Sequence, residues 1–264
     1  MTTSMPEPTL FDLAAESMAP EVTQARQCSD EREPTTLPWY DLLAVFDLET
    51  TGIDVRTSRI VTAYVGVLAA DGEPSEGTTW LADPGIDIPA SASAVHGVTT
   101  EYAREHGRPA AEVVAEVSKA LRSLFTRGVP VVVYNAPYDL SLLAHEARRW
   151  DVPALVDPSP VIDPLVIDKA VDQYRKGKRT LAHTAQHYGV ALTEAHDASA
   201  DAVAAGRVAQ ALGRAWVDQL GVEAQKLHDL QVEWYRTQAK SFQNYMRRER
   251  DASFVADGSW PVRR

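Results

Sequence analysis

The feature that most constrains this chain is an apolar run that ends in two carboxylates. Residues 42–46 read Leu-Leu-Ala-Val-Phe, and Asp47 and Glu49 follow directly. A continuous apolar run of this kind is typical of a central strand that is covered on both faces. Side chains two residues apart on a strand point to the same face. If the strand extends to Glu49, the two carboxylates project together and destabilise each other unless a cation lies between them. If the strand ends before Glu49, the two carboxylates belong to a loop and are solvated.

The order of the other elements predicts a mixed α/β sheet. Five strands are expected from apolar content and flanking turn residues, at residues 42–46, 59–69, 78–81, 129–134 and 161–163. The tight turn Asp71-Gly72 joins the second strand to the third, so these two must be antiparallel. Helices are expected between and after the later strands, beginning at Pro109 and over residues 140–150.

Composition divides the chain into three parts. We expect an acidic arm, disordered or loosely docked, over residues 1–38, a main domain over 39–214, and a helical extension with a tail over 215–264. Residues 1–36 hold seven acidic residues and two arginines, which leaves −5 of the net charge of −11. This balance disfavours non-specific coating of duplex nucleic acid, but it allows a site that meets phosphate through metal ions.

Cysteine content and hydropathy indicate a cytoplasmic protein. Cys28 is the only cysteine of the 264 residues, which excludes an internal disulfide and disfavours a cysteine-based zinc site. No apolar run reaches the length of a membrane span, and residues 1–36 lack the apolar centre of a signal peptide. We therefore expect neither membrane insertion nor export.

Two further segments carry acids at the start of a helix. Asp139 follows the strand at residues 129–134, and Asp201 follows His196 at the entrance to the next helical segment. Each acid alone has an ordinary explanation, because a carboxylate stabilises the first turn of a helix. Together with the pair on the first strand, they could hold two Mg²⁺ or Mn²⁺ ions about 3.5–4 Å apart, as in-line displacement at phosphorus requires. His196 is then a candidate general base.

These three segments resemble the exonuclease motifs of the DEDDh family of 3′→5′ exonucleases. The motifs are residues 47–52, 135–139 and 196–201. The family includes the proofreading epsilon subunit of bacterial replicative polymerases, RNase T and oligoribonuclease. Residues 95–99 (Val-His-Gly-Val-Thr) resemble a further motif of the epsilon-like members, as do residues 177–190, and the similarity covers roughly residues 42–213.

The resemblance implies an RNase H-like fold with a mixed five-stranded sheet flanked by helices, to which this chain adds C-terminal helices. It also implies a role for each motif residue. The metal ligands would be Asp47, Glu49, Asp139 and Asp201; the general base would be His196; Thr50 and Thr51 would hold the terminal 3′ nucleotide; and Asn135 would order the second motif or the substrate. Tyr138 is a departure, because many members have phenylalanine there.

We therefore expect an exonuclease that acts on single-stranded 3′ ends of DNA and releases nucleoside 5′-monophosphates. An RNA-trimming or oligonucleotide-clearing enzyme would use the same chemistry, and the sequence does not reveal how the pocket treats a 2′-hydroxyl. A non-catalytic interaction module with the same fold is a third interpretation. The clustered acids count against it, because a binding module has no need of them.

Two other features concern partners. Residues 7–11 (Glu-Pro-Thr-Leu-Phe) resemble the sliding-clamp-binding peptides of bacterial replication proteins, without their leading glutamine, so a polymerase or a sliding clamp is a candidate partner. A basic cluster at residues 175–179 either leads a single strand toward the metal ions or is a solvated loop.

Overall fold

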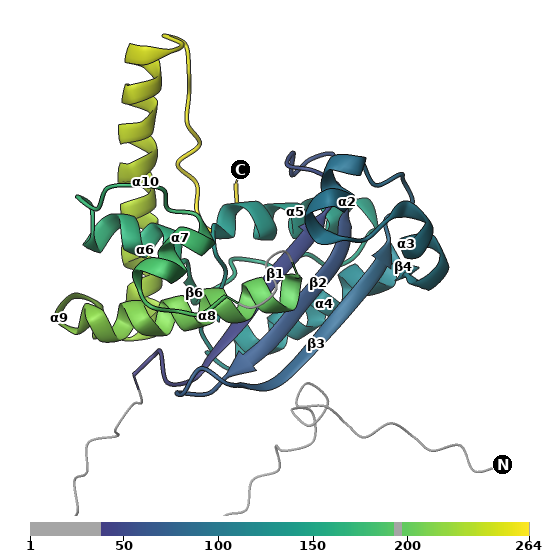
Figure 1. Cartoon of the computed structure of the whole chain (residues 1–264), viewed down its shortest axis with the longest axis horizontal. Coiled ribbons are helices and arrows are strands. Elements are labelled where there is room, and N and C mark those ends of the chain that lie inside the picture. Colours follow the sequence, from purple (N-terminus) through teal and green to yellow (C-terminus); the bar gives the residue numbers. More distant parts are fainter. Residues whose placement is uncertain (1–37, 193–196, 264) are drawn as a thin grey trace, which may run out of the picture. The chain divides into compact units, whose positions relative to one another are not determined.

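A six-stranded mixed sheet forms the framework of the described part of the chain (Figure 1). The structure is a computed structural model and describes residues 38–192 and 197–263. The clamp-like peptide, nearly all of the predicted acidic arm and His196 lie outside the described residues. The strands are β1 (Leu43–Thr50), β2 (Ile60–Leu68), β3 (Pro74–Asp83), β4 (Arg108–Pro109), β5 (Val131–Val132) and β6 (Val161–Ile162).

The strand order is β4-β3-β2-β1-β5-β6. β2 pairs antiparallel with both β1 and β3, whereas β5 runs parallel to both β1 and β6. The prediction of a mixed sheet containing the five expected strands is confirmed. The sixth strand, β4, has two residues and lies parallel to the end of β3, where we expected only the start of a helix. A two-residue strand has too little side-chain pattern to be found from sequence.

Helices cover both faces of this sheet (Figure 1). α8 packs on β1 and β2, and α4 packs on β2, β3 and β5. Their bounds, with those of the other helices, are α2 (Ala90–His96), α3 (Thr100–His106), α4 (Ala110–Thr126), α5 (Ala136–Arg149), α6 (Pro164–Val171), α7 (Leu181–His187), α8 (Ala198–Ala215), α9 (Val217–Leu220) and α10 (Ala224–Glu249). In the part of the chain that the structure describes, no helix is long and apolar enough to cross a membrane.

A glycine in α8 allows this helix to approach the sheet closely. A Cβ atom on Gly206 would lie 2.4 Å from Cδ1 of Leu68 and 2.5 Å from Cγ1 of Val45. Both distances are shorter than any van der Waals contact between carbon atoms, so a larger residue fits at this position only if Leu68 and Val45 shift. The close approach matters for the site because it brings the first turn of α8 to the carboxyl end of β1.

The C-terminal extension packs on the rest of the protein. α10 contacts β6 and α6, and Leu227 and Trp234, expected on the apolar stripe of this segment, lie in or against the core. The last residues, which we expected to form a simple tail, return along α10 (Figure 1). Trp260 is buried, and the backbone N–H of Arg263 donates to Oγ of Ser141 in α5 (2.8 Å). A domain boundary between residues 214 and 215 stays a prediction.

Gly206→Val should lower the free energy of unfolding by about 3 kcal/mol, because the added methyl groups must displace Leu68 and Val45 from a close-packed core. Chemical denaturation monitored by circular dichroism would measure the change. The control is Ala215→Val at the exposed end of α8, which should change the free energy by less than about 0.5 kcal/mol. Equal stability of the two variants would contradict the close approach.

Candidate active site

β1 carries Asp47 and Glu49 as part of the strand, not of the following loop. Asp47 lies opposite Tyr64 and Glu49 opposite Thr62 in the antiparallel ladder with β2, and an irregularity in the register follows Glu49. Leu48 between them is buried, whereas both acids are half-buried. The two carboxylates therefore share one face of β1. It is the face of Val45, which packs against α8.

α5 brings the third acid to the same end of β1. Asp139 stands in the first turn of this helix and is only 3% exposed. Burial raises the pKa of its carboxyl well above the usual range, and hydrogen bonds with the backbone of Asp139 itself and of Leu48 partly offset this. Repulsion from Asp163 and Glu49 raises the pKa further. The influence of Leu48 and Glu49 shows that Asp139 lies beside the end of β1.

The first turn of α8 supplies the fourth acid. Asp197 caps this helix, because its Oδ1 accepts the backbone N–H groups of Ser199 (2.7 Å) and Ala200 (3.3 Å). Asp201 follows in the first turn and is half-buried. The cap is lost if the helix starts elsewhere, so it fixes the position along α8 at which Asp201 reaches the sheet.

The four predicted metal ligands converge electrostatically. Burial raises the pKa of Asp47 well above its usual value, and repulsion from Asp139, Glu49, Asp201 and Asp197 adds to the effect. Burial and then Asp201 and Asp197 raise the pKa of Glu49 to about 7. Carboxylates from β1, α5 and α8 thus lie close enough to destabilise one another's charges. A cation among them would relieve this repulsion.

The donor set fits a hard divalent cation. Every donor is a carboxylate oxygen, the type that Mg²⁺ and Mn²⁺ prefer. Within residues 38–192 and 197–263, no three His, Cys, Asp or Glu side chains are arranged closely enough to enclose a metal ion. The acids therefore converge on one region without forming a closed ligand shell, and their roles as ligands stay a prediction.

A hydroxyl network closes the loop that follows β1. Oη of Tyr138 donates to the carbonyl oxygen of Gly52 (2.5 Å), and Oγ1 of Thr50 donates to the same oxygen (2.8 Å). The two hydroxyl oxygens lie 2.6 Å apart. Phenylalanine, common at position 138 in the DEDDh family, could not make these bonds. The departure from the family pattern therefore ties α5 to the loop.

Thr51 builds the other side of this loop. Its backbone N–H donates to the carbonyl oxygen of Arg59 (3.0 Å), and its Oγ1 accepts the backbone N–H of Arg59 (3.0 Å). The side chains of Thr50 and Thr51 are both buried and hold the loop together. Their predicted contact with the terminal nucleotide stays a prediction, as does that of Asn135, which is exposed just before α5.

Asp163 is a buried residue of this region that sequence reasoning missed. It follows β6, and its carboxylate accepts the backbone N–H groups of Asn135 (3.0 Å) and Ala136 (2.9 Å). It also caps α6 by accepting the N–H of Leu165 (3.0 Å). Asp followed by Pro164 is an N-cap signal that the sequence does contain. The contact with the second motif is long-range, so no local pattern predicts it.

Two of the four residues of the predicted basic cluster form ion pairs with a buried carboxylate. Nη2 of Arg175 and Nη1 of Arg179 both form ion pairs with the buried carboxylate of Asp168. Neither of the interpretations that we considered for this cluster, a guide for a single strand or a solvated loop, therefore fits these two arginines. Lys176 and Lys178 are exposed.

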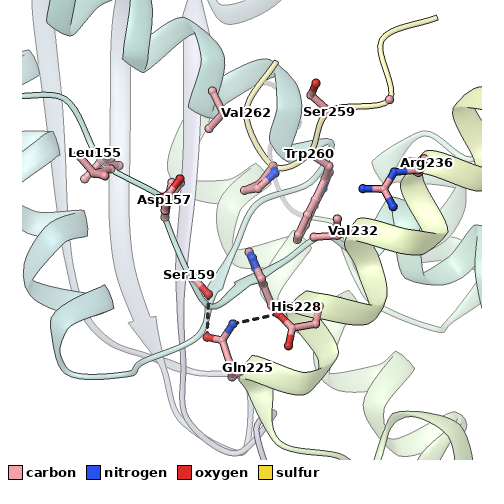
Figure 2. Close-up of a pocket in the computed structure, with 15 residues that line it drawn as sticks. Leu155, Asp157, Ser159, Gln225, His228, Val232, Arg236, Ser259, Trp260 and Val262 are labelled. Carbon is pink, nitrogen blue, oxygen red and sulfur yellow. Dashed lines mark hydrogen bonds between the residues drawn. The ribbon is translucent and has the colours of Figure 1, made fainter. Parts of the chain in front are cut away.

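A hollow of about 890 Å³ lies elsewhere, between α10, the segment 155–159 and the C-terminal residues 258–262. Figure 2 shows His228, Trp260 and Val232 on one side of it and Leu155 and Asp157 on the other. None of the predicted metal ligands or substrate-binding residues lines this hollow. It is therefore separate from the candidate active site.

Comparison with known proteins shows which family the chain belongs to. A family model of the RNase T type, described as Exonuclease, matches residues 44–209, more than half of the chain. The chain belongs to this exonuclease family. The match spans all three motifs and ends within α8, so the DEDDh resemblance is confirmed and α9, α10 and the tail lie outside the family's domain.

Among similar proteins is the DNA polymerase III subunit epsilon-like protein of Rhodobacter capsulatus, 29% identical over 168 residues, which are 61% of this chain and 22% of the relative. Another is DNA polymerase III PolC-type of Streptococcus thermophilus, 28% identical over 165 residues, 62% of this chain and 10% of the relative. The chain thus spans less than a quarter of these proteins.

Among solved structures, Escherichia coli exonuclease I in complex with a dT13 oligonucleotide is similar, with a TM-score of 0.56 and 19% identity. The likeness covers 69% of this chain and 43% of that one. At this identity the likeness shows the fold alone, and it confirms the predicted RNase H-like α/β class.

Tyr138→Phe should lower the free energy of unfolding by about 1 kcal/mol, because a hydrogen bond to Gly52 is lost while the ring is kept. Thermal and urea unfolding would measure the loss. Tyr174→Phe is the control, since Tyr174 is 87% exposed, and it should leave stability within about 0.5 kcal/mol of the parent. A Tyr138 variant as stable as the control would show that the hydroxyl network contributes nothing.

Proposed function

We propose that this protein is a metal-dependent 3′→5′ exonuclease that removes nucleoside 5′-monophosphates from single-stranded 3′ ends of DNA. The observation that supports this best is the convergence of Asp47, Glu49, Asp139 and Asp201 at the end of β1 in a member of an exonuclease family. A set of acids that repel one another is costly to fold, so their position favours a role in cation binding.

The four carboxylates would hold two divalent ions. When bound, such ions activate water and stabilise charge on the leaving oxygen. His196 would accept the proton of the attacking water, a bond would form between this water oxygen and phosphorus, and the bond from phosphorus to the 3′ oxygen would break. The 3′ oxygen then takes a proton from solvent. The loop closed by Thr50, Thr51 and Tyr138 would receive the terminal nucleotide beside β1.

Single-stranded DNA is the substrate that the comparisons favour. The relatives are named as DNA polymerase III proteins, and the exonuclease I structure contains an oligonucleotide of thymidines. We extend this preference, and an association with a polymerase or a sliding clamp, to the present chain as part of the proposal. Among the basic residues at 175–179, Arg175 and Arg179 are paired with Asp168 and only the side chains of Lys176 and Lys178 are exposed. This low density of exposed positive charge suits a site that binds phosphate mainly through metal ions.

Asp201→Ala should lower kcat/KM on a 3′-labelled single-stranded oligonucleotide by more than about 100-fold. Losing a residue that only supports a ligand costs about 10–100-fold, and losing the ligand itself costs more. EDTA should abolish activity, and excess Mg²⁺ or Mn²⁺ should restore it. Asp218→Ala removes the same charge from the exposed start of α9 and should cut at the parental rate. Parental activity in the folded Asp201 variant would refute the proposed site.

His196→Gln should reduce kcat by a smaller factor than Asp201→Ala and should leave Mn²⁺ binding intact. A histidine general base works only when neutral, so the parental rate should decline as the pH is lowered and the imidazole takes up a proton. This decline should be absent from the pH profile of the variant. A variant that keeps the parental profile would show that another group accepts the proton.

A further inference from the structure

The carboxylate of Asp163 is fully buried and surrounded by N–H donors from three parts of the chain. Its Oδ1 accepts the N–H groups of Asn135 and Leu165, each at 3.0 Å. Its Oδ2 accepts the N–H of Ala136 at 2.9 Å and faces Nε1 of Trp260 at 3.4 Å. A buried carboxylate is stable only with such donors, so Asp163 fixes the backbone around it.

This backbone is the start of the second motif. Asn135 has φ 64° and ψ 48°, a left-handed conformation that residues other than glycine adopt at a cost. The hydrogen bonds from Asn135 and Ala136 to Asp163 hold this turn in place. Asp139 follows in the first turn of α5, so its carboxylate moves whenever the turn moves.

The C-terminal extension holds Asp163 in turn. The side chain of Gln231 in α10 is fully buried, and its Oε1 accepts the backbone N–H of Asp163 at 2.6 Å. Its Nε2 donates to the carbonyl oxygens of Val161 (3.0 Å) and Leu227 (3.1 Å). The side-chain amide of Gln231 thus connects α10 to the backbone at both Val161 and Asp163, at the end of β6.

The C-terminal segment adds a second connection. The ring of Trp260 packs against His228, with 4.9 Å between centroids, and Nδ1 of His228 accepts the N–H of Val161 at 3.0 Å. Figure 2 shows these two rings together at the wall of the hollow. Trp260 therefore reaches Asp163 from a position that is fixed on α10.

We propose that Gln231 and Trp260 are positioning residues for Asp139, which act through Asp163. The C-terminal extension, which lies beyond the family match at residues 44–209, is then part of the active-site framework. The inference rests on the proposed function, because it takes Asp139 to be a metal ligand. It goes further in giving a positioning role to α10 and the C-terminal segment, which the family's domain does not include.

Gln231→Met tests the proposal, since it keeps the length of the side chain and removes its hydrogen bonds to Asp163 and Val161. Calorimetric titration with Mn²⁺ should show an affinity about 10-fold weaker than that of the parent, and kcat on a single-stranded oligonucleotide should fall by a similar factor. Gln238→Met is the matched control. Gln238 also lies on α10 and donates to a backbone oxygen, that of Val166, but it forms no hydrogen bond with Asp163. Its variant should bind Mn²⁺ and cut DNA as the parent does.

Trp260→Phe is the second variant, and it decides the question if Gln231→Met does not fold. It keeps an aromatic ring against His228 and removes the N–H that faces Asp163 together with part of the indole, so Mn²⁺ affinity should fall about 2–10-fold. If the parent binds no Mn²⁺, the proposed function fails. If the parent binds Mn²⁺ and a folded Gln231 or Trp260 variant binds it equally well with unchanged kcat, or if the Gln238 control loses as much, the positioning role is wrong.

Discussion

Repulsion among carboxylates at the end of β1 is the constraint on which the rest of the structure depends. Asp47 and Glu49 share a face of a strand that is otherwise apolar up to its last residue, Thr50, and Asp139 and Asp201 are brought beside them. Burial strengthens this repulsion, because little water is present to screen it. Such an arrangement is unfavourable by itself, so contacts of the surrounding elements, besides those of the acids themselves, must hold each acid in place.

These contacts act on the helix, strand or loop that carries an acid. Gly206 lets α8 approach β1, the Asp197 cap fixes where α8 starts, and the hydroxyl of Tyr138 ties α5 to the loop after β1. Asp163 fixes the turn before α5 and is itself held by α10. These stabilising contacts thus fix the geometry close to the site, as expected where function requires like charges to stay together.

The sequence predicts those parts of this arrangement that have a local signature. The apolar run of β1, the turn at Asp71-Gly72 and the order of the motifs can be predicted because each is carried by residues that are close together in the sequence. Three other features cannot be predicted in this way: the two-residue strand β4, the ion pairs of Arg175 and Arg179 with Asp168, and the hydrogen bond between Gln231 and Asp163. Each depends on residues brought together only by the fold, and an arginine looks the same in sequence whether it is solvated or paired.

The packing of α8 on β1 also bears on the biosynthesis of the enzyme. β1 is the first strand of the sheet and α8 the last helix of the family's domain, so Asp47 and Asp201 stand near opposite ends of the matched segment. A nascent chain that has been synthesised only to the end of α7 contains the first two motifs and lacks the third. If the proposed chemistry needs all four acids, an unfinished polypeptide cannot degrade nucleic acid, and nuclease activity begins only when synthesis has passed α8.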